Sequence, residues 1–223
     1  MGTTRLQLYN DALLCAGQRA ITDLTVTEES RRLLDQVWNN GGVDGCLEEA
    51  QWEFAMRTIR IDYDPSIMPP DGFGYNRGFD KPTDWILTSA LCSDEFFRTP
   101  LLQYVDEAGF WFSSLDTMYV RYVSNDSGYG GNLANWPKSF TEFVAAHFAT
   151  QLILKITNDE ARMRLFINLE NPLHSIRGRA LMKAKSRCAM SGPTVMPAQG
   201  SWVSSRRGGS VRGDGGFGTG NLY

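Results

Sequence analysis

The hydrophobic pattern of residues 136–157 is the strongest structural signal in this chain. Apolar side chains recur at four-residue steps in one column: Phe140, Val144, Phe148, Leu152 and Ile156. A second column extends the apolar surface around much of the helix: Phe143, Ala146, His147, Ile153 and Leu154. Pro137 suits the first turn, because a missing N–H costs nothing there. A helix that is apolar on most sides is normally buried, so the pattern predicts the central helix of a bundle.

Two shorter helical patterns precede this segment. Thr4 is a suitable N-cap for a first helix, and Gly17 is well placed to end it. Thr25 with Glu28 three residues later has the spacing of a capping box, which predicts the start of a second helix, and Thr27 competes for the same capping role. The Asn-Asn-Gly-Gly sequence at 39–42 breaks or bends that helix.

The helical pattern of apolar residues is absent between residues 57 and 135. A proline- and glycine-rich loop follows residue 63, and short runs of β-type residues come after it at 85–91, 101–106, 110–113 and 118–123. The sequence at 106–109, Asp-Glu-Ala-Gly, predicts a hairpin connection between two of these runs. A second loop, at 125–135, is rich in glycine and asparagine. We therefore expect residues 57–135 to form a small β insertion.

A further helix is predicted after the central one. Asn158 followed by Asp159 and Glu160 is typical of a helix N-terminus, since the helix dipole favours acids in the first turn. Apolar positions carry the pattern to about residue 189, and Pro172 should kink it. From 191 onward the periodicity ends: nine of the last 33 residues are glycine, and such a segment buries too little apolar surface to order itself.

The predicted fold class is mainly α with a β insertion (α+β). Residues 1–56 and 136–190 are expected to form an antiparallel bundle of about four helices. Residues 57–135 are expected to form a small β-sheet domain inserted between helices 2 and 3. Residues 191–223 are expected to form an extended, glycine-rich C-terminal arm that takes its order from partner chains.

The amino-acid composition of the chain limits the classes of function that it could have. The chain is 42% hydrophobic and 21% charged, which is ordinary for a globular protein. A net charge of −3 gives no reason to expect nucleic-acid binding by the chain as a whole. The four cysteines lack paired spacing, which argues against a zinc site or a disulfide framework and suits a reducing compartment. The uncharged stretch at 143–154 is shorter than the roughly 20 residues that span a membrane, and the N-terminus is not a signal peptide, so we expect a cytosolic chain with no membrane partner.

The sequence shows no catalytic constellation. His147 lies on the apolar helix, where it is expected to be a satisfied core or interface histidine. His174 has no Cys, Asp or Glu at ligand spacing. Three loop acids, Asp62, Asp64 and Asp71, are expected to be solvated, and no phosphate-cradling glycine loop precedes a helix. We therefore expect no enzyme activity, no metal and no cofactor.

The arm contains a short arginine–glycine tract with Arg206, Arg207 and Arg212. Such tracts occur in RNA-binding tails, which makes an RNA-binding protein the alternative function. The other interpretation is an arm whose arginines pair with acidic surfaces of a partner protein.

An ordered set of motifs resembles the head-to-tail adaptor family of tailed phages, of the tail tubular protein A or head-completion type typical of short-tailed phages. Residues 8–32 resemble the opening helix, glycine and second helix of that family. The sequence AQWEFA at 50–55 resembles the end of its second helix. Trp136-Pro137 with Phe140 resembles the start of its third helix, and the basic helix to Ala189 with the Gly-Ser-Trp sequence at 200–202 resembles its carboxyl end.

The resemblance implies a structural connector in the virion, at the head–tail junction, made in the host bacterial cytoplasm. It implies a ring, commonly of twelve copies, docked under the portal protein and joined to the tail nozzle or tubular protein and to tail fibres, with genomic DNA passing through during ejection. The arm would contact the portal or a neighbouring subunit through Trp202, Arg206, Arg207, Arg212, Phe217 and Tyr223. Loops of the β insertion would face the tail through Phe73, Tyr75, Phe79 and Tyr129.

Overall fold

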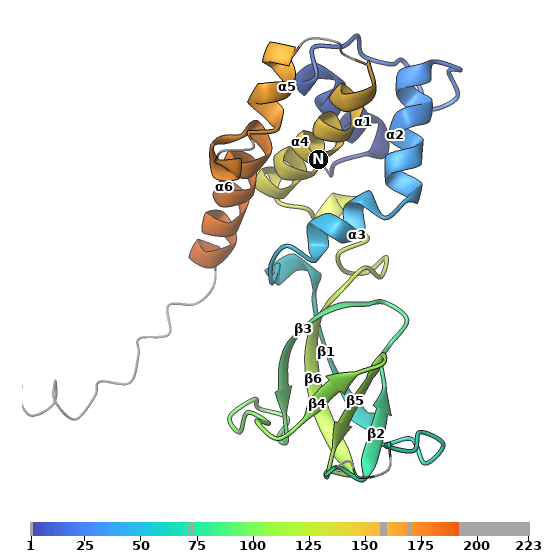
Figure 1. Ribbon diagram of the computed structural model, residues 1–223, viewed down its shortest axis with the longest axis vertical. Helices are drawn as coiled ribbons and strands as arrows, with labels where there is room; N and C mark the ends of the chain where they lie inside the picture. The colour runs from blue at the N-terminus through green and yellow to red at the C-terminus, as the bar shows by residue number, and fades with distance from the viewer. Residues whose placement is uncertain (1, 71, 73, 157–159, 169–170, 192–223) are drawn as a thin grey trace, which may run out of the picture. The chain divides into compact units, whose positions relative to one another are not determined.

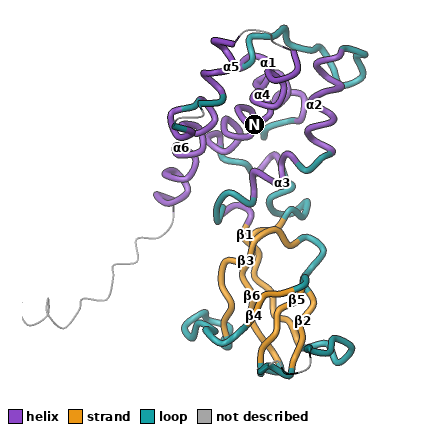
Figure 2. Tube along the Cα trace, in the orientation of Figure 1, coloured by secondary structure: helices purple, strands orange, loops and turns teal. Residues whose placement is uncertain are grey.

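The computed structural model describes residues 2–70, 72, 74–156, 160–168 and 171–191 (Figures 1 and 2). The α-helices of this part are α1 Arg5–Cys15, α2 Glu29–Asn39, α3 Gly42–Leu47, α4 Lys138–Ile156, α5 Glu160–Phe166 and α6 Ile176–Ser191. Its strands are β1 Met56–Asp62, β2 Arg77–Asp80, β3 Trp85–Cys92, β4 Val105–Glu107, β5 Phe110–Ser113 and β6 Thr117–Ser124. Short 3-10 turns occur at η1 Glu53–Ala55, η2 Leu133–Asn135 and η3 Pro172–His174.

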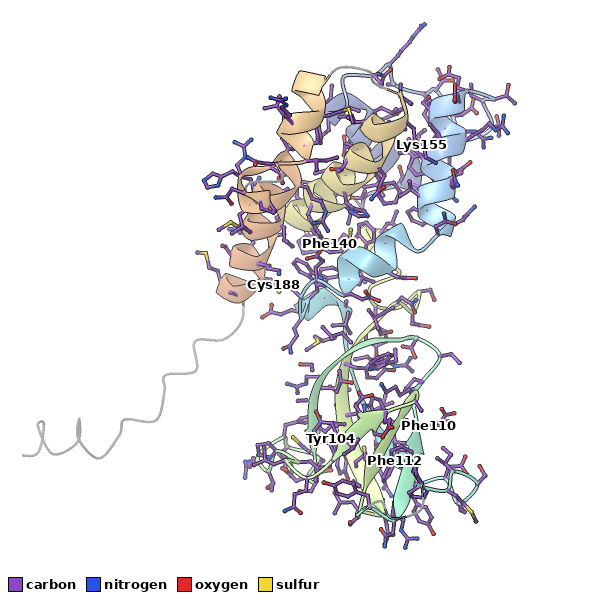
Figure 3. The ribbon with its side chains drawn as sticks, in the orientation of Figure 1. Tyr104, Phe110, Phe112, Phe140, Lys155 and Cys188 are labelled. Atoms are coloured by element: carbon purple, nitrogen blue, oxygen red, sulfur yellow. The ribbon has the colours of Figure 1, made fainter. Side chains whose placement is uncertain are left out.

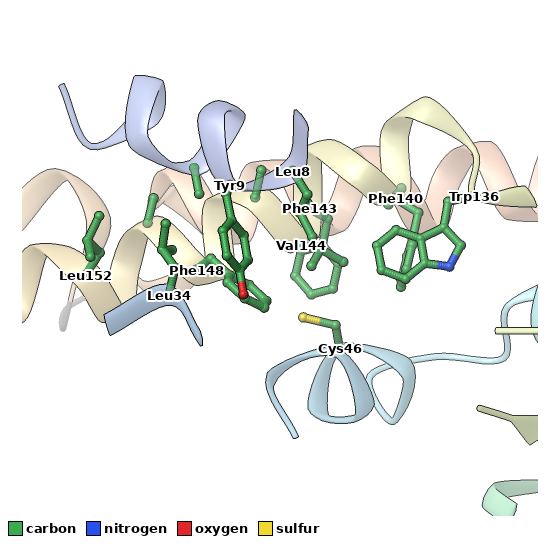
Figure 4. Close-up of a cluster of buried hydrophobic side chains, with 14 of the residues drawn as sticks. Leu8, Tyr9, Leu34, Cys46, Trp136, Phe140, Phe143, Val144, Phe148 and Leu152 are labelled. Carbon is green, nitrogen blue, oxygen red and sulfur yellow. The ribbon is translucent and has the colours of Figure 1, made fainter. Parts of the chain in front are cut away.

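Helix α4 is the centre of the helical core. It packs against α1, α2 and α3 from the first part of the chain and against α5 and α6 from the last part. Phe143, Val144 and Phe148 are completely buried, and each large apolar side chain removed from water contributes about 1.5–3 kcal/mol. Figure 4 shows these side chains of α4 beside Leu8 and Tyr9 of α1 and Cys46 of α3. The prediction of a buried central helix is confirmed.

The expected bundle of about four helices with one inserted sheet is wrong. The described residues form six α-helices and two three-stranded antiparallel sheets. Helix α2 ends before Gly41, whose left-handed backbone (φ 77°) is compatible with glycine and starts α3 in a new direction. Pro172 begins the turn η3 between α5 and α6, so the expected kink is a complete break.

Two of the predicted helix starts have different outcomes, and the third, at Asn158, lies outside the described residues. Thr4 accepts a hydrogen bond from the backbone N–H of Gln7, and the Gln7 side chain accepts one from the N–H of Thr4, which confirms the first N-cap. The capping box from Thr25 to Glu28 is wrong. Asp23 accepts hydrogen bonds from the N–H groups of Thr25 and Val26, so Thr25 belongs to a turn and α2 begins only at Glu29.

The β region contains two small sheets in place of the single sheet that was expected. The first has the order β1-β6-β3 and the second the order β2-β5-β4. The hairpin at 106–109 is confirmed: β4 pairs antiparallel with β5, and Ala108 and Gly109 both have positive φ, as a tight hairpin turn requires. Strand β2 was not predicted because it lies in the glycine-rich loop; Gly78 is needed there because Ile67 would meet any added Cβ at 2.4 Å.

Candidate docking groove beside the last helix

A groove of about 770 Å³ lies between the last turns of α6, the first turn of α4 and the segment around η1. Its apolar lining comes from Trp52, Phe54, Pro137, Phe140, Ala184 and Met190. Figure 3 labels Phe140 of α4 and Cys188 of α6, two of the residues on its walls. Three segments distant in the sequence therefore build one concave surface.

Aromatic rings pack beneath the groove: Trp52 and Phe140 are each 1% exposed, and Phe54 is half-buried. The ring centroid of Phe140 lies 4.8 Å from that of Trp52, 4.8 Å from that of Phe54 and 5.0 Å from that of Trp136. Trp52 is held in place because its indole Nε1 donates to the carbonyl of Cys46 at 3.1 Å. Figure 4 shows the adjoining rings of Phe140 and Trp136. This cluster places aromatic side chains under the apolar lining of the groove.

The rim of the groove is charged. Lys183 of α6 pairs with Glu142 of α4, with 2.5 Å between Nζ and Oε2. Lys138 and Arg187 are exposed at the same rim, and neither forms an ion pair with another described residue. Glu53 is the second acid among the lining residues. An apolar lining beside two available cations suits a ligand that combines an apolar group with a carboxylate.

The end of α6 is attached to the η1 segment through Cys188. Its Sγ accepts from the N–H of Glu53 at 3.4 Å and lies 3.6 Å from the carbonyl oxygen of Gln51. These two contacts join the end of α6 to the η1 segment, so both sides of the groove meet at Cys188.

His147 of α4 lies in a polar contact with α6 and with the turn that follows α3. Arg177 of α6 donates from Nε to His147 Nδ1 at 3.0 Å and forms an ion pair with Glu49. Burial, and secondly the charge of Arg177, lower the pKa of His147 to about 4. The imidazole is neutral at pH 7 and Nδ1 is its acceptor, so the expectation of a satisfied interface histidine is confirmed.

The predicted arm contacts lie outside the described residues: Trp202, Arg206, Arg207, Arg212, Phe217 and Tyr223. Phe73 lies outside them as well. Tyr75 is half-buried in a loop, and Tyr129 is half-buried with the Arg57 guanidinium 5.4 Å from its ring centroid. Phe79 is in β2 rather than in a loop and is completely buried, packed in the β core with Trp111 and Tyr122. Phe79 is therefore a core residue, and Tyr75 and Tyr129 remain the described members of the predicted tail-side set.

The groove residues were not predicted as a site. Trp52 and Phe54 belong to the AQWEFA motif, and Phe140 follows Trp136-Pro137. Both motifs were recognised in the sequence, but nothing in the linear pattern indicated that Trp52, Phe54 and Phe140 would lie together. The sequence feature that could have indicated the groove is the number of aromatic residues just before η1 and at the start of α4.

No metal centre is evident in the described part of the chain, where no group of three or more His, Cys, Asp or Glu side chains is placed to hold an ion. His174 is exposed. Of the loop acids, Asp62 accepts from Thr117 and Arg60, Asp64 accepts from Ser66, and Asp71 lies outside the described residues. Among these same residues, no helix combines the length and the apolar character needed to cross a membrane.

No model of a protein family matches this sequence, and no curated protein matches it significantly.

Proposed function

We propose that this chain is a structural head-to-tail adaptor of a tailed bacteriophage, most consistent with the short-tailed type. In this role copies of the chain form a closed ring between portal and tail, with genomic DNA passing through the ring. The proposal rests on the order of the motifs that resemble the adaptor family and on the distribution of surfaces in the described structure.

The docking groove is the observation that carries the proposal. It has aromatic side chains in its lining and charged residues at its rim, as a surface that anchors a peptide does. It lies beside the end of α6, where the glycine-rich segment 192–223 begins. A segment of this composition orders on binding and covers much surface at modest affinity per area, and avidity across many copies then makes a joint tight.

Head-to-tail contacts between identical copies generate rings when the rotation closes. A chain that carries a groove and a separate arm has the two unlike surfaces that such a contact needs. The strands between α3 and α4 form two small sheets, and we propose that the loops of these sheets face a different partner, the tail.

The test uses the full-length protein and particles that contain it. Antibody labelling should place the chain at the head–tail junction, and electron microscopy of the purified protein or of the particle should show a closed ring with a central channel. Deleting 192–223 should leave the circular dichroism spectrum of the folded chain largely unchanged and abolish joining to the portal. Labelling elsewhere in the particle, or normal joining by the truncated chain, would contradict the proposal.

One observation favours RNA binding as a second candidate. Residues 136–223 contain twelve basic and five acidic residues, whereas 1–135 contain ten and twenty. Helix α6 carries five cations and no acid, and Arg179, Lys185 and Arg187 are exposed on it. An RNA-binding chain would bind RNA with a steep salt dependence, and changing Arg206, Arg207 and Arg212 to Ala would weaken that binding.

A further inference from the structure

We propose that the docking groove is the receptor for the glycine-rich segment of a second copy of this chain, with Phe217 as the apolar anchor and Asp214 as its charged partner. This inference rests on the proposed ring and names the contact between neighbouring copies. The inference gives a function to the groove residues, for which the sequence predicted none.

The chemistry of the segment matches that of the groove. Asp214 is the one acid in the sequence 192–223 and precedes Phe217 by three residues. The groove offers a lining with aromatic side chains and, at its rim, Lys138 and Arg187, which form no ion pair with described residues. An aromatic ring on that lining removes apolar area from water, and a carboxylate at the rim pairs with a guanidinium or ammonium group.

Glycine explains how the segment would fit a narrow site. Gly215, Gly216, Gly218 and Gly220 surround Phe217, so the backbone on both sides has no side chains to exclude it from the groove. The available volume of about 770 Å³ accommodates a phenyl ring together with the adjoining backbone.

The length of the segment suits a second copy. Twenty-six residues separate Ser191, at the end of α6, from Phe217, and an extended chain of that length reaches up to about 90 Å. Such a reach exceeds the length of α4, which at 19 residues is about 30 Å long. When each copy gives its segment to one neighbour and receives another from the opposite side, the contact is heterologous and closes a ring.

The first experiment measures binding of a fluorescent peptide, residues 208–223, to the full-length Phe217→Ser chain by fluorescence anisotropy. In this receptor the chain's own anchor is removed and the groove is intact. We expect saturable binding, weakened about thirtyfold by Phe217→Ser in the peptide, since an anchor residue contributes about 2 kcal/mol or more. Absence of saturable binding, or an unchanged affinity for the altered peptide, would overturn the proposal.

The rim is tested by charge reversal with a matched control. Lys138→Glu with Arg187→Glu should weaken binding about tenfold, and Asp214→Lys in the peptide should restore it. The control, Arg179→Glu with Lys185→Glu, changes the net charge by the same amount; both residues are exposed on α6 and neither lines the groove. Equal weakening by the control pair would show a general charge effect and overturn the assignment.

Native mass spectrometry distinguishes a second copy from the chain's own segment. The unaltered chain should form oligomers. The Lys138→Glu/Arg187→Glu chain keeps its segment, and the Phe217→Ser chain keeps its groove, so an equimolar mixture of these two should form heterodimers and nothing larger. An unaltered chain that remains monomeric while the mixture forms heterodimers would place the contact within one chain and overturn the proposal. The contact can also be correct while the adaptor function is wrong. In that case the peptide would bind and the heterodimers would form, but the particle would contain no ring. A failure of this contact and a failure of the proposed function are therefore distinguishable.

Discussion

Arg177 donates a hydrogen bond from Nε to Nδ1 of His147 at 3.0 Å, while its Nη2 pairs with Glu49. One arginine of α6 is thereby joined to α4 and to the residues that follow α3. The bond to His147 exists only while the imidazole is neutral, since a protonated ring has no acceptor and repels the guanidinium.

This contact predicts a pH dependence of stability. Because the pKa of His147 falls from 6.5 in the unfolded chain to about 4 in the folded one, its contribution is fully present above pH 6.5. It is lost progressively as the pH falls from 6.5 toward 4, by at most about 1.4 kcal/mol per pH unit. Urea unfolding at a series of pH values should show this loss.

The matched variants for this test are His147→Gln and His174→Gln. Glutamine keeps an acceptor for Arg177 and does not titrate, so His147→Gln should remove the part of the loss between pH 6.5 and 4. His174 is exposed, and changing it should leave the loss as in the original chain. An unaltered pH profile in His147→Gln would assign the loss to another group.

Lys81 is predicted to stabilise the β region. Its Nζ lies 3.7 Å from the ring centroid of Trp85, 5.3 Å from that of Trp111 and 2.6 Å from Oδ1 of Asp106, and its side chain is 9% exposed. Lys81→Ala should lower the free energy of unfolding by about 1–3 kcal/mol, since the variant loses a desolvated cation–π contact and leaves Asp106 with Trp111 Nε1 alone as its hydrogen-bond partner. Tryptophan fluorescence during urea unfolding measures the change.

The exposed pair of Arg60 with Asp62 is the control for Lys81. The side chain of Arg60 is 61% exposed, and Arg60→Ala should change the free energy of unfolding by less than about 1 kcal/mol. Equal effects of the two variants would mean that the aromatic rings around Lys81 contribute nothing.

Gly130 is predicted to be required for a close contact between chain segments. An added Cβ would lie 2.4 Å from the carbonyl oxygen of Ser124, 3.0 Å from Cβ of Ala55 and 3.1 Å from Cδ1 of Leu47. The carbonyl of Gly130 also accepts from Trp136 Nε1 at 2.8 Å. Gly130→Ala should therefore lower the free energy of unfolding by about 1–3 kcal/mol, as overpacking does. Thermal unfolding detects a change of this size.

Gly45 provides the matched control for Gly130. It lies in α3, and a Cβ there would meet no atom within 4 Å. Gly45→Ala should stabilise the chain by up to about 1 kcal/mol, because alanine is the better helix former. A similar loss of stability in both variants would contradict the role assigned to the contact at Gly130.

Thiol labelling gives a prediction for the groove. When the peptide of residues 208–223 occupies the groove of the Phe217→Ser chain, alkylation of Cys188 should slow, because Cys188 lines that groove. Cys15 is exposed on α1 and should react at the same rate with and without peptide. Cys46 should stay unreactive throughout, since burial raises its pKa to about 12. Mass spectrometry of the labelled chain reports each site, and equal protection of Cys15 would show that the effect is not local.

Features that depend on neighbours in the sequence were predictable. The apolar columns of α4 predicted a buried helix, because a 3.6-residue period places them on the same faces whatever the helix packs against. Thr4 predicted its cap, and the Asp-Glu-Ala-Gly sequence predicted the β4–β5 turn, because three or four adjacent residues contain all the groups involved. Thr25 shows the limit of this reasoning, since Asp23 offered a competing local acceptor with better geometry in the folded chain.

Long-range pairing was decided by the tertiary structure alone. Strand β6 pairs with β1 and β3, and strand β5 pairs with β2 and β4. The sequence pattern does not predict these pairings, because they depend on how the loops close in three dimensions. The groove has the same origin. Trp52, Phe140 and Ala184 are separated by 88 and 44 residues, and they share one surface because α4 and α6 pack together, a contact whose free energy comes from apolar area buried across the whole helical core.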